Sequence, residues 1–145
     1  MVLKHIAPNR DIPVLQLSID MEQSLDYHYR LARQLAPLRD MGVLIIGSGN
    51  IVHNLELSAL KFWSNKPYQW AVDFDNWVKM KIDERDWGSL FRYSNIGPGA
   101  KLAVPTADHY LPLLYVLSLA NQGESIEHIY EGLFRGMSLR CLRVG

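Results

Sequence analysis

The chain has 145 residues, its 15 lysines and arginines balance 15 aspartates and glutamates, and 48% of it is hydrophobic. This length and composition are typical of one globular domain, and we place no boundary within residues 1–145. Zero net charge argues against nucleic-acid phosphates or an anionic membrane as partners. The single cysteine, Cys141, excludes an intrachain disulfide and a zinc site made of cysteines. We expect a packed Cys141 thiol and a reducing, cytoplasmic setting.

The first half of the chain predicts a strand, a helix and a second strand. The short apolar run at residues 14–19 ends at Asp20, which indicates a buried strand and then a helix cap. Apolar residues recur every three or four positions over residues 21–40, as in an amphipathic helix, with Pro37 loosening its last turn. The β-branched and apolar run at residues 43–46 predicts a second buried strand. This order predicts a βαβ unit with parallel strands.

The second half is expected to be mostly helical. Residues 66–85 place aromatic and aliphatic side chains at helical spacing, with charged residues such as Asp75 on other faces, so this helix should cover the sheet. A shorter helix should follow at residues 87–93, and residues 111–120 are apolar nearly all round, which predicts a buried helix. Residues 137–144 alternate apolar and polar side chains and should form a half-exposed edge strand.

Two of the five histidines lie where a ligand site is expected. His53 follows the second predicted strand and the turn Gly47-Ser48-Gly49, at the strand end where α/β proteins bind ligands. A rigidly held neutral imidazole there suits a metal ion, and a hydrogen bond to a neighbouring carbonyl explains it equally well. His109 should present its ring near a helix start, although its position alone favours a structural role. The glycine turn lacks the third glycine and the lysine of a phosphate-binding loop.

Four stretches of the sequence form a recognisable pattern: residues 13–19, 35–40, 45–55 and 105–115. The phrases around His53 and His109 are much more specific than either histidine alone. Together they resemble the class III extradiol ring-cleavage dioxygenases, and within that superfamily the DOPA 4,5-dioxygenase type. The resemblance runs from Val2 to Gly145 and corresponds to the C-terminal portion of family members. It implies an α/β fold with a parallel or mixed central sheet flanked by helices, incomplete relative to the full family fold.

The resemblance also implies an active site that contains both His53 and His109. Each is a candidate metal ligand for one non-haem Fe(II) or Zn(II) ion, and each is a candidate catalytic residue that moves a proton or orients the substrate. The implied reaction is the opening of a catechol ring with O2, which needs free coordination positions for both substrates. Supporting or substrate-binding candidates are Asn50, Asn54, His28 and Tyr110.

The N-terminus departs from the family pattern. Family members carry two further metal-coordinating histidines ahead of the part that matches Val2, and His5 matches neither. One hypothesis is an extradiol dioxygenase that is incomplete as an isolated chain. The alternative is a non-catalytic truncated homologue that self-associates or binds a chain supplying the N-terminal half. Either way, loss of neighbouring strands should expose apolar surface at residues 14–19 and 43–46.

Overall fold

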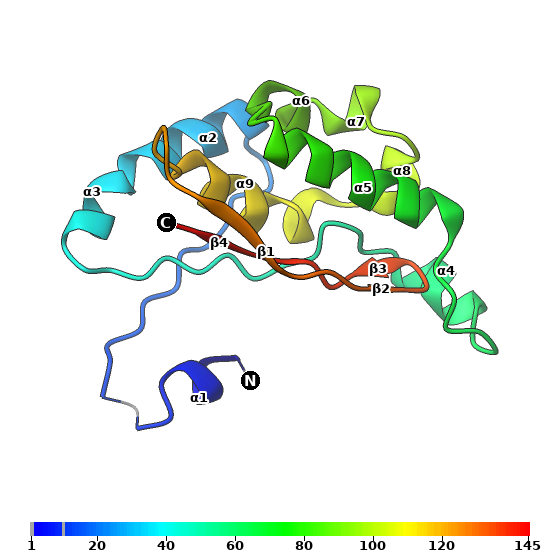
Figure 1. Ribbon diagram of the computed structural model, residues 1–145, viewed down its shortest axis with the longest axis horizontal. Helices are drawn as coiled ribbons and strands as arrows, with labels where there is room; N and C mark the ends of the chain where they lie inside the picture. The colour runs from blue at the N-terminus through cyan, green and yellow to red at the C-terminus, as the bar shows by residue number, and fades with distance from the viewer. Residues whose placement is uncertain (1, 10) are drawn as a thin grey trace.

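A computed structural model describes residues 2–9 and 11–145, apart from the side chain of Val2. Figure 1 shows most helices gathered on one side of thin strands and extended segments, with the N-terminal helix on the opposite side. The helices are α1 (Val2–Ile6), α2 (Leu25–Gln34), α3 (Ala36–Asp40), α4 (Leu55–Leu60), α5 (Gln69–Asp83), α6 (Trp87–Phe91), α7 (Tyr93–Ile96), α8 (Ala100–Ala103), the 3-10 turn η1 (Ala107–His109) and α9 (Leu111–Ser118). The strands are β1 (Ile126–Tyr130), β2 (Leu133–Phe134), β3 (Met137–Ser138) and β4 (Cys141–Val144). Among the described helices, none combines the length and apolar character needed to cross a bilayer.

The helical pattern over residues 21–40 is realised as two helices, α2 and α3. Ser24 caps α2, because its side-chain oxygen accepts a hydrogen bond of 3.2 Å from the backbone N–H of Tyr27. Leu35 ends α2 and begins α3, so Pro37 lies in the first turn of a new helix, where no N–H is required. Pro37 therefore marks a division of the predicted helix rather than a loosened end.

Helix α5 lies at the centre of the core, and the helix predicted over residues 66–85 is confirmed. Its side chains Phe74, Val78 and Ile82 are fully buried at helical spacing. Helix α9 packs against α2 and is buried along most of its length, as the apolar run at residues 111–120 predicted. The predicted helix at residues 87–93 is α6, followed directly by α7.

The described strands form two small antiparallel sheets, so the predicted central parallel or mixed sheet and its βαβ unit are wrong. β1 pairs with β4, and β2 pairs with β3. Residues 14–19 and 43–46 belong to no strand, and most of their apolar side chains are exposed. An extended segment becomes a strand only when a neighbouring backbone satisfies its N–H and C=O groups. Within the described chain these segments have no such neighbour, and only the coarser class, mixed α and β, holds.

The C-terminal strand prediction is confirmed in part, because residues 137–144 divide into β3 and β4. Side chains along β4 alternate between exposed and half-buried, as expected of an edge strand. Cys141 occupies an exposed position of β4, with its Sγ 3.6 Å from the carbonyl oxygen of Leu139. The expectation of a packed thiol is therefore wrong, because the Cys141 side chain is exposed.

Candidate active site

His53 and His109, distant in sequence, meet in the structure. Their ring centroids are 3.5 Å apart and their planes differ by 18°, so the two imidazoles stack. The pair is only partly buried, and the His109 side chain is 38% exposed. The structure therefore brings together the two histidines that the sequence singled out, with their rings accessible from outside.

His53 is held by backbone hydrogen bonds on both sides of its segment. Its N–H donates to the carbonyl of Ala103 at the end of α8, at 2.8 Å. His53 also forms an isolated antiparallel bridge with Met137 in β3, and the next residue, Asn54, donates its N–H to the carbonyl of Gly136 at 2.9 Å. The position of His53 is thus fixed by α8 and β3.

His109 is held by the glycine turn that precedes His53. The N–H of Asn50 donates to the carbonyl of His109 at 2.9 Å, which links the two histidine segments directly. A Cβ on Gly49 would overlap that same carbonyl oxygen, and a Cβ on Gly47 would lie 2.5 Å from the carbonyl oxygen of Pro112. The glycines therefore let this segment run against the start of α9, which is a packing role rather than phosphate binding.

Electrostatics favour a neutral His53. Burial lowers the pKa of His53 below its ordinary value of 6.5, the neighbouring His109 lowers it further, and Asp108 partly offsets both. The Asp108 carboxylate lies 3.5 Å from Nε2 of His109 and accepts a hydrogen bond from the Thr106 hydroxyl, which lowers the pKa of Asp108. A neutral imidazole can bind a metal ion or accept a proton, so His53 is in a form suited to either role.

Both asparagines flanking His53 stabilise its loop. The Asn50 side chain donates from Nδ2 to the carbonyl of Ser138 at 2.6 Å. Asn54 caps α4, since its Oδ1 accepts from the N–H of Leu57 at 2.9 Å while its Nδ2 donates to the carbonyl of Leu102 at 2.9 Å. Both side chains therefore bind backbone groups in the described structure.

The two remaining candidates, His28 and Tyr110, lie in the interior. His28 in α2 places Nδ1 2.8 Å from the hydroxyl of Tyr115, and its Nε2 is buried without a described partner. Tyr110 is fully buried, packs on Tyr93 and donates its hydroxyl to the carbonyl of Leu90 at 3.3 Å. Burial raises the pKa of Tyr110 far above its usual range. The structure therefore surrounds both side chains with core aromatic residues.

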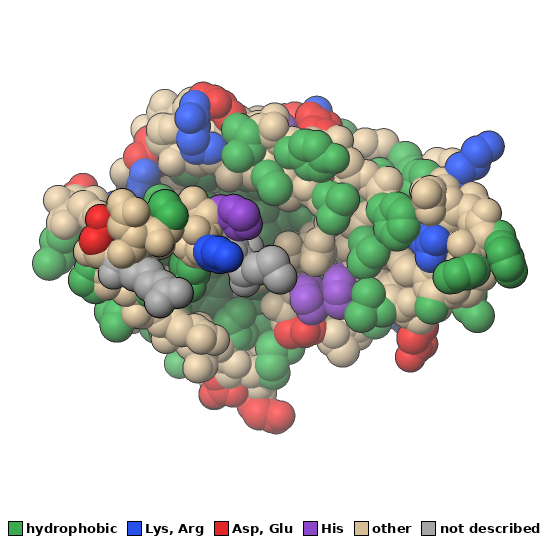
Figure 2. All heavy atoms as spheres, turned by 90° about the horizontal axis from the view of Figure 1, so that it is seen from below, with side chains coloured by type: hydrophobic (Ala, Val, Ile, Leu, Met, Phe, Trp, Pro, Cys, Tyr) green, Lys and Arg blue, Asp and Glu red, His purple; other side chains and the backbone are tan. Residues whose placement is uncertain are grey.

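A broad groove of about 950 Å³ opens beside His109. Its described lining comes from residues 43–51, from α9 and from β4, and it combines aliphatic side chains with polar backbone and Asn50. Figure 2 shows the hollow with hydrophobic side chains around it and histidine side chains at its edge. The volume is in the range of small-molecule sites, although the groove is open along its length.

The described residues supply only part of a metal site. Imidazole nitrogens are good ligands for iron and zinc, and the neutral state favoured for His53 is the binding form. Nowhere in residues 2–9 and 11–145 do three or more His, Cys, Asp or Glu side chains gather in a metal-binding group. Catalytic zinc and iron sites normally use three protein ligands. The histidine pair alone therefore does not complete such a site.

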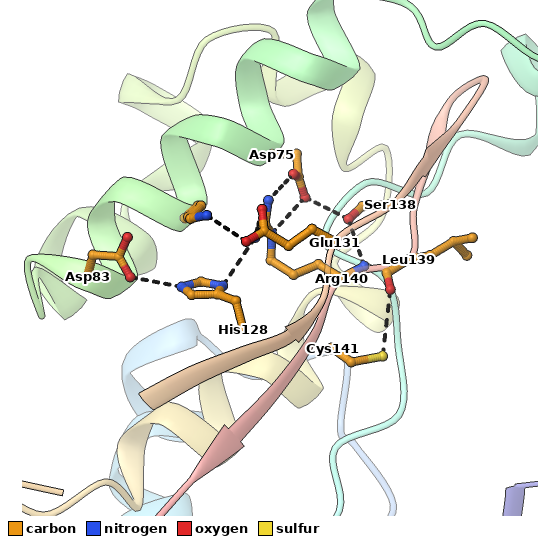
Figure 3. Close-up of polar contacts among 9 residues, drawn as sticks. Asp75, Asp83, His128, Glu131, Ser138, Leu139, Arg140 and Cys141 are labelled. Atoms are coloured by element: carbon orange, nitrogen blue, oxygen red, sulfur yellow. Dashed lines mark hydrogen bonds and ion pairs between the residues drawn. The ribbon is translucent and has the colours of Figure 1, made fainter. Parts of the chain in front are cut away.

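Sequence reasoning missed a buried ion pair behind the site, shown in Figure 3. The side chains of Arg140 and Asp75 are 2% and 4% exposed, and both ends of the Arg140 guanidinium contact the carboxylate. Asp75 was expected on a charged face of its helix. It lies instead on the buried stripe of α5, four residues after Ala71 and three before Val78. An acidic residue in register with an apolar stripe is the signal that predicts a buried partner.

Comparison with known proteins gives a consistent result. Residues 1–136 match the family described as the catalytic LigB subunit of aromatic ring-opening dioxygenase. The chain is 37% identical over 148 residues to 4,5-DOPA dioxygenase extradiol of Escherichia coli (strain K12), covering 99% of this chain and 54% of that protein. It is 35% identical over 123 residues to 4,5-DOPA dioxygenase extradiol of Beta vulgaris, covering 85% of this chain and 45% of that protein.

A solved structure agrees with these relatives. The crystal structure of an uncharacterised protein from Escherichia coli K12 superposes with a TM-score of 0.90 at 37% identity, covering 99% of this chain and 60% of that one. The family model, the curated relatives and the solved structure all match nearly the whole of this chain. The chain belongs to the LigB family, whose relatives here are named extradiol dioxygenases. It spans about half the length of the curated relatives it matches.

Proposed function

We propose that this chain provides the His53–His109 part of an active site that opens catechol rings, of the DOPA type, with O2. The observation that carries the proposal is the stacked imidazole pair, of which His109 lines an open groove, in a chain of the LigB family. Residues 1–145 act as one domain in this proposal. The low cysteine content supports a reducing, cytoplasmic setting.

The two histidines are assigned different tasks by their surroundings. His53, favoured in the neutral state, acts as a metal ligand or accepts a proton from a catechol hydroxyl. The Asp108 carboxylate lies 3.5 Å from Nε2, at the edge of the His109 ring, while one face of that ring stacks on His53. A non-haem Fe(II) or Zn(II) ion, when bound, supplies the coordination positions for the substrate. Ligands beyond this pair complete the metal site.

The supporting residues act through the backbone. Asn50 and Asn54 fix the loop that carries His53, one by bonding β3 and the other by capping α4. His28 and Tyr110 serve the site through packing, since both are buried among aromatic rings.

The test is oxygen consumption and formation of ring-opened product from DOPA, using the chain supplied with Fe(II) and with a polypeptide equivalent to the remaining half of the relatives, because ligands beyond the histidine pair complete the metal site. Replacing His53 or His109 with Ala should remove product, because each substitution removes half of the imidazole pair. His5→Ala is the matched control, since His5 is exposed in α1. Turnover that survives both active-site substitutions would exclude the proposal.

A second candidate function is that of a non-catalytic partner-binding module. The specific observation is the exposure of apolar side chains along two extended segments, with Leu15 at 96% and Leu44 at 73%. We assign the occupant of this surface as a polypeptide equivalent to the remaining half of the relatives, because the chain covers 54% of the Escherichia coli enzyme. Absence of turnover together with tight binding of such a partner would favour this function.

A further inference from the structure

Ser138 in β3 joins the His53 segment to the protein interior. It is 1% exposed and forms hydrogen bonds through its N–H, its carbonyl and its hydroxyl, which also accepts from the N–H of Arg140 at 3.3 Å. Its N–H donates to the carbonyl of Val52 at 2.9 Å, and its carbonyl accepts from Nδ2 of Asn50 at 2.6 Å. Its hydroxyl donates to Oδ1 of Asp75 in α5 at 2.6 Å. One residue thus contacts the histidine-bearing segment through its backbone and the core helix through its side chain.

Asp75 is itself held firmly in place. Nε of Arg140 donates to Oδ1 of Asp75 at 3.2 Å, and Nη2 of Arg140 donates to the other carboxylate oxygen. Because both side chains are almost fully buried, moving either one leaves an unpaired charge away from water, which is strongly unfavourable. The Asp75 carboxylate therefore offers Ser138 a fixed hydrogen-bond acceptor.

The remaining contacts of Arg140 close the network seen in Figure 3. Its Nη1 lies 3.0 Å from Glu131 and 3.1 Å from Nδ1 of His128. Since an arginine can only donate, His128 accepts at Nδ1, and its Nε2 donates to Asp83 at the end of α5, at 2.8 Å. The guanidinium is thus tied to α5, to β1 and to the segment after β1.

We propose that Asp75 and Ser138 are positioning residues for His53. The path runs from the Arg140–Asp75 pair in the core to the Ser138 hydroxyl, then through the β3 backbone to the bridge between Met137 and His53. A buried ion pair is not required for stability, because well-packed apolar residues stabilise a core as well or better. A charged acceptor does fix the direction of a hydroxyl donor, and hence the register of β3 against the histidine segment. This inference rests on the proposed function for its catalytic meaning.

The test compares two buried serines. Ser138→Ala removes the bond to Asp75, whereas the matched control Ser118→Ala removes a buried hydroxyl in α9 that donates to the carbonyl of Leu114 at 2.6 Å. Ring-proton NMR of the metal-free chain should show a several-fold weaker contact between the His53 and His109 rings in Ser138→Ala alone. Zn(II) used as a probe should bind about 10- to 100-fold more weakly to that variant, as is typical when a residue supporting a ligand is lost.

The outcomes separate the two proposals. The ring contact needs neither metal nor turnover, so it decides positioning even if the wild-type chain binds no Zn(II) and opens no catechol. An unchanged ring contact in Ser138→Ala, or an equal loss in Ser118→Ala, overturns the positioning role. If Ser138→Ala does not fold, Ser138→Cys keeps the side-chain size with a weak donor and should give a smaller change in the same direction.

Discussion

At the scale of single residues, the site depends on close backbone approach as much as on its histidines. His53 and His109 were identified from the sequence because their phrases match a family pattern. The role of Gly49 was not, since a glycine turn predicts close approach of the backbone without identifying the group that it approaches. Only the structure shows that the turn lies against the carbonyl of His109.

Gly49→Ala should therefore separate the histidine pair. The added methyl overlaps the carbonyl oxygen of His109, so the backbone must shift, at about 1–3 kcal/mol of unfolding free energy. A displacement of this kind should lower any turnover about 100-fold. Urea unfolding and the ring contact by NMR measure the two effects. Gly88→Ala is the control, because a Cβ there would meet only side-chain ends, of Arg92 at 3.4 Å and of Asp86 at 3.7 Å; equal behaviour of the two variants would contradict the prediction.

The lowered pKa of His53 predicts a stability change with pH. The folded protein holds His53 neutral below its ordinary pKa of 6.5, whereas the unfolded chain takes up the proton there. The unfolded state then binds more protons, so stability falls as pH drops from about 7.5 to about 5.5. His53→Gln should lose less stability over this interval than the wild type, by thermal unfolding. His5→Gln should follow the wild-type curve of stability against pH. A steeper loss of stability in His53→Gln than in the wild type would contradict a lowered pKa of His53.

At the scale of elements, the longer helices were predictable, whereas among the strands only the C-terminal one was predicted, and that in part. Helices α5 and α9 satisfy their own backbone hydrogen bonds, so a periodic apolar stripe is enough to predict them. The runs at residues 14–19 and 43–46 have strand-like composition, but a strand also requires a partner, which the described structure does not supply. Asp75 shows a further limit, because its burial depends on Arg140 from a distant segment.

Phe74 tests the central role of α5. It is fully buried and contacts the rings of Trp77, Tyr93 and Tyr110. Phe74→Ala should reduce the free energy of unfolding by about 3–5 kcal/mol through lost burial and a residual cavity. Trp63→Ala removes a larger ring that is 94% exposed and should change stability by less than about 0.5 kcal/mol in urea titrations. Similar losses of unfolding free energy in Phe74→Ala and Trp63→Ala would contradict the central place of α5 in the core.

Glu124 tests the connection between α3 and the turn before β1. Two hydrogen bonds of 2.9 Å from Arg39, helped by the N–H of Asn121, lower the pKa of Glu124 from 4.5 to about 2. The stabilisation is present above the unfolded pKa and is lost as pH falls from 4.5 toward 2. Glu124→Gln should cost about 1 kcal/mol at neutral pH and flatten this acid loss. Glu127→Gln is the control, because Glu127 forms an exposed pair with Arg143. In acid titrations followed by circular dichroism, it should neither reduce stability at neutral pH nor flatten the acid loss.

At the scale of the whole molecule, one side of the fold is open. The extended segments and the groove of about 950 Å³ lie on that side, and the relatives continue well beyond the matched half. Exposed apolar strips of this kind mark association surfaces. Both the exposed apolar surface and the incomplete set of metal ligands fit a chain that spans about half the length of its relatives.

Charging this surface should reduce association. Leu15→Lys with Leu44→Lys should weaken binding to a polypeptide carrying the N-terminal half of a relative by at least about tenfold, because both side chains are exposed apolar anchors. Titration calorimetry measures the affinity, and light scattering shows whether a second copy of the chain competes for the surface. Trp63→Lys, on the loop after α4, is the control. Unchanged affinity in the double variant would place the surface elsewhere.

The sequence alone determined the longer helices, the family and the two histidines, because periodicity and short phrases are local properties of a chain. The tertiary structure decided the pairing of those histidines, the burial of Asp75 against Arg140 and the failure of two apolar runs to become strands. Each of these depends on which distant backbone or charge lies alongside. The spacing of residues along one segment does not specify which distant backbone or charge will lie beside it.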